Sequence, residues 1–167
     1  MTGSGAGGLA GKVALVTGGA RGISRVTARV LAEAGARIAI LDRDPADEAI
    51  AWIEAVGGTA QAVQADIADL DAYQSGLAEL TDRVGPADVL LYGAGITNHI
   101  ASLGKMTLAG WQRELTVNLT GAFLAIQHVA PHMIDQAWGR IVLISSGAAR
   151  GGLSRQAGYS ASKAGLL

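Results

Sequence analysis

Short apolar runs and helical segments alternate along almost the whole chain. Runs rich in valine, isoleucine, leucine and alanine predict strands at Val13–Val16, Arg37–Leu41, Thr59–Ala65, Asp88–Tyr92 and Arg140–Ile144. Each run is followed by a segment with apolar residues at helical spacing. Strands that alternate with helices are typical of a parallel sheet with right-handed crossovers, so the pattern predicts an α/β fold.

The boundaries of the helices are marked by residues that favour helix ends. Asp69 and Thr107 are expected to cap two helices, and Gly35 to end the first one. The predicted helices cover about 22–34, 46–56, 69–84, a long segment from 107, and a last segment from about 158. Pro131 is expected to bend or interrupt the long helix, and Gly139 to end it.

Composition narrows the range of functions. The chain has 167 residues, of which 50% are hydrophobic, and these values favour one globular domain, predicted here over 12–167 after a glycine-rich tail over 1–11. The net charge of -1 predicts no nucleic-acid partner, and no apolar run is long enough for a membrane span. Without cysteine or a signal peptide, a cytoplasmic location is expected.

The glycine-rich segment Thr17–Ile23 lies between the first strand and the first helix. A helix N-terminus offers unpaired N–H groups and a partial positive charge, and glycine lets the backbone approach a phosphate. Asp42 ends the second strand, where a carboxylate can accept hydrogen bonds from an adenosine ribose and repel a 2′-phosphate. Arg21 favours that phosphate instead, so the residues predict NAD as cofactor, with NADP as the alternative.

Tyr159 and Lys163 are four residues apart and share a helix face, with Ser146 thirteen residues before the tyrosine. A tyrosine hydroxyl exchanges protons poorly at neutral pH unless a nearby positive charge stabilises its phenolate. Together with a serine that can hydrogen-bond the same substrate oxygen, the pair predicts proton transfer to or from an alcohol or carbonyl group.

These motifs together resemble the short-chain dehydrogenase/reductase family over residues 12–167, and its 3-oxoacyl-carrier-protein reductases most. The segments that carry the resemblance are Gly18–Ile23, Asp66-Ile67, Gly93-Ala94-Gly95, Val117-Asn118, Ser145-Ser146 and Tyr159-x-x-x-Lys163. The resemblance implies an NAD(P)-dependent oxidoreductase that acts on an alcohol or ketone. The hydride chemistry belongs to the cofactor.

The resemblance also implies residue roles. The cofactor-binding residues would be Gly18, Arg21, Gly22, Ile23, Asp42, Asp66, Ile67, Gly93, Ala94, Gly95, Tyr159 and Lys163. Tyr159 would be the general acid in reduction and the general base in oxidation. Lys163 would stabilise the phenolate and bind the nicotinamide ribose, Ser146 would orient the substrate, and Asn118 would hold a water that links Lys163 to solvent. A homodimer or homotetramer is implied for the complete protein.

The chain departs from the family pattern at three places. Ser24 stands at the third glycine of the turn, and is expected to shift the helix slightly. Tyr92-Gly93 replaces two asparagines, one of which steadies the central strands. Later strands of the family are missing, so the expected fold is a doubly wound Rossmann-type sheet of order 3-2-1-4-5. A truncated fragment that binds cofactor without turnover is therefore the alternative function.

The three histidines are not predicted to form a metal site. His128 and His132 are four apart on a helix, but no third ligand has matching spacing, so a solvated or interface helix face is the better interpretation. His99 follows Gly95 in a loop, where it either faces substrate or is simply exposed.

Overall fold

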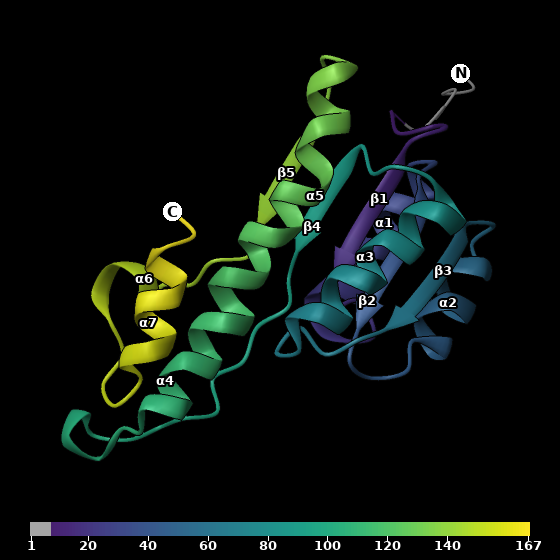
Figure 1. Cartoon of the computed structure of the whole chain (residues 1–167). Coiled ribbons are helices and arrows are strands. Elements are labelled where there is room, and N and C mark those ends of the chain that lie inside the picture. The colour runs from purple at the N-terminus through teal and green to yellow at the C-terminus, as the bar shows by residue number, and fades with distance from the viewer. Residues whose placement is uncertain (1–7) are drawn as a thin grey trace.

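The computed structural model describes residues 8–167 and contains a five-stranded, fully parallel sheet (Figure 1). The strands are β1 (Val13–Thr17), β2 (Arg37–Asp42), β3 (Thr59–Gln64), β4 (Val89–Tyr92) and β5 (Arg140–Leu143). Their spatial order is β3-β2-β1-β4-β5, with all four neighbouring pairs parallel. The predicted doubly wound α/β fold and its strand order are confirmed.

Helices connect the strands. They are α1 (Gly22–Glu33), α2 (Asp47–Glu54), α3 (Leu70–Val84), η1 (Leu103–Lys105), α4 (Leu108–Leu115), η2 (Thr116–Thr120), α5 (Gly121–Asp135), α6 (Ala148–Gly151) and α7 (Ala157–Ala164). Two predicted N-caps are confirmed, because Asp69 accepts a hydrogen bond from the Ala72 N–H and Thr107 from the Gly110 N–H. Gly35 follows α1 with φ +99°, a conformation that favours glycine.

Side chains on β1 alternate between the two faces of the sheet and so belong to two separate apolar cores. Val13 and Leu15 join the core that α3 and α5 cover, through residues such as Tyr73 and Val129. Ala14 and Val16 join the core beneath α1 and α2. With helices on both faces, the central strands are almost wholly buried, as the apolar runs predicted.

The long helix predicted from Thr107 differs from the expectation. It is interrupted not at Pro131 but at η2, a π-helical turn, while α5 continues through Pro131 to Asp135. Pro131 lies on the exposed side, so solvent can bond the Gln127 carbonyl that loses its usual partner. The helix also ends before Gly139, because Ala137 adopts a positive φ of 53°.

Strand β5 is the edge of the sheet next to β4, and its side chains are less covered than those of the central strands. Ile141 is 42% exposed and Val142 47%.

At the other end of the chain, the Leu9 N–H donates to the Ala34 carbonyl at the end of α1, so the predicted tail boundary at residue 11 falls next to a described turn. Residues 1–7 of that tail lie outside the described residues. No helix over 8–167 is long and apolar enough to cross a membrane.

A polar cluster around Asp88 joins the amino ends of β1 and β4 to the end of α5. Asp88 is 7% exposed, and its carboxylate accepts hydrogen bonds from the Val13 N–H at 2.8 Å, Lys12 Nζ at 3.0 Å and Gln136 Nε2 at 2.8 Å. Burial raises the pKa of Asp88, but the three hydrogen bonds and the charge of Lys12 outweigh it and lower the pKa overall.

Replacing Asp88 by Asn should therefore destabilise the protein at neutral pH. Removal of a buried charged acceptor is expected to cost about 1–3 kcal/mol of the free energy of unfolding. Because the folded pKa lies below the unfolded value, this contribution is complete above about pH 4 and is lost as the pH falls through the folded pKa. Urea unfolding across this range should show the two proteins converging in acid. Asp71→Asn, at an exposed position, is the control.

Candidate functional site

The turn between β1 and α1 passes very close to the loop after β4. Gly18 has a φ of +69°, and a Cβ at this position would lie 2.9 Å from the backbone N and Cα of Ala94. Only glycine combines that φ with that close approach. The turn leads into α1, which has no acidic residue in its first turn and no side-chain N-cap. The N-terminus of α1 therefore keeps N–H groups free for an anion.

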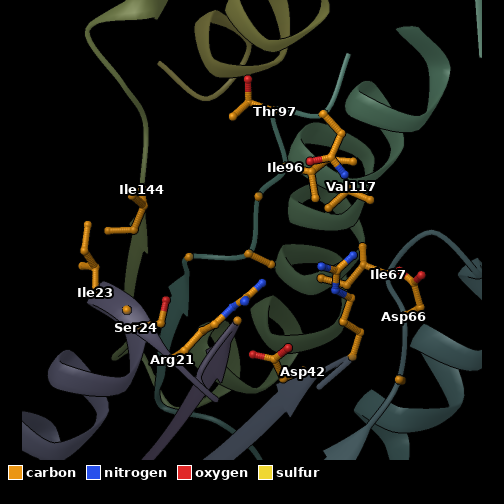
Figure 2. A pocket seen from close by; sticks show the side chains of 18 of the residues that line it. Arg21, Ile23, Ser24, Asp42, Asp66, Ile67, Ile96, Thr97, Val117 and Ile144 are labelled. Atoms are coloured by element: carbon orange, nitrogen blue, oxygen red, sulfur yellow. The ribbon is translucent and has the colours of Figure 1, made fainter. Parts of the chain in front are cut away.

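A cavity of about 510 Å³ opens at this helix N-terminus, along the carboxyl ends of the strands (Figure 2). The predicted cofactor-binding residues on its wall are Gly18, Arg21, Gly22, Ile23, Asp42, Asp66, Ile67, Gly93, Ala94 and Gly95. The wall reaches Ile144 at the end of β5 but does not include Ser146, Tyr159 or Lys163. The structure thus brings the ten predicted residues together, with the predicted proton-transfer residues beyond one end.

Asp42 has a structural task as well as a place on the cavity wall. One carboxylate oxygen accepts the Ala20 N–H at 2.9 Å and the other accepts the Asp44 N–H at 3.0 Å. The side chain is 8% exposed and so ties the glycine-rich turn to the end of β2. Sequence reasoning placed Asp42 at the site but did not predict these two bonds.

Two arginines lie beside Asp42 on the same wall. Arg21 Nη2 is 3.5 Å from an Asp44 carboxylate oxygen, and Arg43 Nε is 3.7 Å from the other. Asp44 therefore holds both guanidinium groups near the end of β2. Arg43 was not predicted as a site residue, although its position directly after Asp42 is a signal that could have found it.

The far wall of the cavity is closed by Asp66 and by Arg113 of α4. Asp66 accepts the Ala68 N–H at 2.9 Å, and its other carboxylate oxygen lies 3.3 Å from Arg113 Nη2. Arg113 also lines the cavity. Sequence reasoning missed Arg113, since its partner belongs to a distant segment and no local pattern marks the pair.

Asn118 lies in the π-helical turn and is completely buried. Its Nδ2 donates to the Ile96 carbonyl and to Ser162 Oγ, both at 2.9 Å, while Oδ1 accepts the Ile96 N–H at 2.8 Å. The side chain therefore joins the loop after β4 to α7. This contact holds α7, which also packs against α4 and α6, in a fixed place beside the cavity.

Lys163 of α7 is 4% exposed, and its Nζ donates to the Ile144 carbonyl at 2.7 Å. Its Nζ is 5.9 Å from the centre of the Tyr159 ring. Burial lowers the pKa of Lys163 from its usual value. Nearby, Ser145 Oγ donates to the Lys163 carbonyl and Ser146 Oγ accepts the Ala148 N–H. Lys163 thus joins α7 to the end of β5 through its ammonium and its backbone carbonyl, whereas Ser146 bonds within its own loop.

The histidines lie away from the cavity wall. His99 Nε2 accepts the Thr107 N–H at 3.0 Å. This bond fixes the loop after β4 to the start of α4. His128 Nε2 is 2.8 Å from Thr81 Oγ1, and His132 Nε2 is 3.6 Å from Asp88. Among residues 8–167 no three His, Asp or Glu side chains are grouped so that they could hold a metal ion.

A comparison with known proteins identifies the family. Residues 12–167 match the family model for short chain dehydrogenases, and the chain belongs to this family. It is 41% identical over 162 residues to a 3-oxoacyl-[acyl-carrier-protein] reductase of Synechocystis sp., covering 95% of this chain and 65% of that protein. A 2-dehydro-3-deoxy-L-rhamnonate dehydrogenase (NAD(+)) of a Sphingomonas species is 35% identical, with 97% and 64% covered. The chain thus spans about two thirds of the length of these relatives.

Solved structures give the same result for the fold. A metagenomic short-chain oxidoreductase in complex with NADP superposes with a TM-score of 0.89 at 36% identity, covering 95% of this chain and 72% of that one. Carveol dehydrogenase of Mycobacterium avium in complex with NAD has a TM-score of 0.87 at 28% identity, with 96% and 63% covered. The relatives include both NAD and NADP complexes, so they support a nicotinamide cofactor without deciding between the two.

Tyr92, one of the departures from the family pattern noted in the sequence, makes a buried hydrogen bond. Its ring is buried at the end of β4, and its hydroxyl donates to the Val117 carbonyl in the π-helical turn. The carbonyl of Val117 in the π-helical turn thus receives a side-chain hydrogen bond from a neighbouring strand. The Tyr92 side chain therefore joins the end of β4 to the turn that carries Asn118.

Tyr92→Phe should destabilise this turn without changing the volume of the core. Because the Val117 carbonyl would be left buried without its partner, we expect a loss of about 1–3 kcal/mol in the free energy of unfolding, measured in urea. Tyr159→Phe removes the same atom from a tyrosine that is only partly buried, and should cost much less. Equal stability of the Tyr92→Phe protein and the parent would show that the bond to the turn is unimportant.

Proposed function

We propose that the protein is a nicotinamide-dependent oxidoreductase that interconverts a small alcohol and its ketone, with NAD as the preferred cofactor. The observation that carries the proposal is the cavity at the uncapped N-terminus of α1, with Asp42 at one end and the buried Lys163 beyond the other. The free N–H groups suit a pyrophosphate, and the carboxylate suits the hydroxyls of an adenosine ribose. The cofactor supplies or accepts the hydride.

The proposed proton path runs through α7. Tyr159 donates a proton to the carbonyl oxygen in reduction and accepts it from the alcohol in oxidation, while the ammonium of Lys163 stabilises the phenolate. Ser146 donates a hydrogen bond to the same substrate oxygen. A Cβ on Gly95 would lie 3.2 Å from Lys163 Nζ and 3.5 Å from Asn118 Oδ1, so both polar atoms border one small space. This placement supports the role of Asn118 in holding a water next to Lys163.

The substrate and the assembly of the whole protein are also proposals. Reduction of a 3-oxoacyl thioester by NADPH is the alternative reaction, supported by the Synechocystis relative and by Arg21 and Arg43 near the adenosine end.

A homodimer or homotetramer is supported by apolar side chains on α5, where Phe123 is 59% exposed and Ile134 73%. That residues 1–167 alone bind cofactor without turnover stays a prediction, as does the cytoplasmic location.

Cofactor choice tests the role of Asp42. We expect NADH to bind about ten- to a hundredfold more tightly than NADPH, because the carboxylate repels a 2′-phosphate. Asp42→Asn keeps an oxygen acceptor but removes the charge. The preference for NADH over NADPH should therefore become smaller or change to a preference for NADPH. Titration by nicotinamide fluorescence measures both dissociation constants. Asp47→Asn, exposed on α2 and outside the cavity wall, is the matched control. Tighter binding of NADPH to the parent protein would contradict the assignment.

The proton-transfer assignment is tested by two substitutions in the whole protein. Tyr159→Phe keeps the ring and removes the proton, so turnover of a secondary alcohol should fall by at least about a hundredfold while NADH affinity stays close to that of the parent. Lys163→Ala should reduce both turnover and affinity, because the lysine is assigned two roles. Substantial activity in the Tyr159→Phe protein would mean that another group transfers the proton.

A further inference from the structure

Ser24 is a buried polar side chain that faces the cavity. It lies in the first turn of α1, is 4% exposed, and belongs to the cavity wall (Figure 2). No hydrogen bond found among residues 8–167 uses this hydroxyl, whereas Thr27, one turn later, donates to the carbonyl of Ile23. Because the hydroxyl lines the cavity without a partner in the described part of the chain, it is available to donate a hydrogen bond to a ligand there.

Gly93, on the opposite wall, provides the space that the Ser24 side chain occupies. A Cβ built on Gly93 would overlap Ser24 Oγ and lie 3.3 Å from Ser24 Cβ. Gly93 is not among the described glycines with positive φ, so its backbone does not itself require glycine. Glycine is required at position 93 because the Ser24 side chain occupies the space that a Cβ would take. The two departures from the family pattern, which looked independent in the sequence, are therefore a complementary pair.

The surroundings of the Ser24 hydroxyl favour an anion. The first turn of α1 contains no acidic side chain and no side-chain N-cap, and Gly22, Ile23 and Ser24 of this turn line the cavity. The hydroxyl adds a side-chain donor to the free backbone N–H groups of this turn. Between this turn and Gly93–Gly95, the position is suited to the phosphates of a dinucleotide rather than to its adenine, which would lie toward Asp66 and Arg113 at the far wall.

We propose that Ser24 is a cofactor-binding residue, whose hydroxyl donates a hydrogen bond to a phosphate oxygen of the dinucleotide, and that Gly93 keeps open the rotamer that makes this bond. The assignment rests on the proposed function, because it takes the cavity to be the dinucleotide site. It gives this chain one hydrogen-bond donor to the phosphates that a glycine at position 24 cannot provide.

The first experiment removes only the hydroxyl. Ser24→Ala should weaken the binding of both NADH and ADP about three- to tenfold, the effect of one hydrogen bond, while the thermal midpoint of the ligand-free protein stays unchanged. ADP contains the diphosphate but lacks the nicotinamide half, so it separates a phosphate contact from a nicotinamide-ribose contact. Ser75→Ala makes the same chemical change on an exposed face of α3, outside the cavity wall, and should leave both affinities unchanged.

The second experiment tests the pairing of Ser24 with Gly93. Gly93→Ala should force the hydroxyl out of its rotamer and weaken ADP and NADH binding at least as much as Ser24→Ala does. In the Ser24→Gly background the new methyl group has space, so Gly93→Ala should cost much less there. The expected result is a clear non-additivity of the two changes in a double-mutant cycle of dissociation constants.

Each outcome decides a separate point. Unchanged NADH and ADP affinities in Ser24→Ala, with a parent protein that binds both, would overturn the Ser24 assignment and leave the proposed function intact. A loss confined to NADH would also overturn it, because the contact would then lie on the nicotinamide half. A parent protein that binds neither NADH nor NADPH would overturn the proposed function itself, and the Ser24 assignment with it.

Discussion

The close approach of the chain at Gly18 and Ala94 is the constraint on which the rest of the site depends. β1 and β4 are neighbours in the sheet, with Thr17 opposite Tyr92, so the loops that follow them leave the sheet side by side. Thr17 Oγ1 also accepts the Ala94 N–H at 3.3 Å. The helix after β1 then covers one face and the segment after β4 turns to the other. A crevice is unavoidable where the two connections diverge, and the cavity lies there.

Two polar side chains connect distant segments around the site. Tyr92 joins β4 to the π-helical turn, and Asn118 joins this turn to the loop after β4 and to α7. Both are buried, so each of these bonds is made away from competing water. The position of α7, and with it Lys163, is therefore set by contacts with segments that precede it in the chain, rather than by the stability of an eight-residue helix.

Much of the fold followed from the sequence because its signals are local. Apolar runs, capping residues and a helix-ending glycine each act within a few positions, and they predicted the strands and most boundaries. The strand order was predicted from the resemblance to the family. The π-helical turn was not predicted, because nothing in its sequence distinguishes it from an ordinary helix; its partners lie on β4 and α7. Arg113 and the hydrogen bonds of Asp42 were missed for the same reason. Ser24 and Gly93 were both noticed, but only the structure shows that one side chain fills the space left by the other.

Lys163 is buried with a backbone carbonyl as its hydrogen-bond acceptor, and among residues 8–167 no carboxylate forms an ion pair with it. A protein normally neutralises an interior ammonium with an acid. Burial without such a partner lowers the pKa of Lys163. A negatively charged group bound close to this ammonium would raise that pKa again. Binding of an anionic ligand beside Lys163 would therefore be coupled to uptake of a proton at alkaline pH.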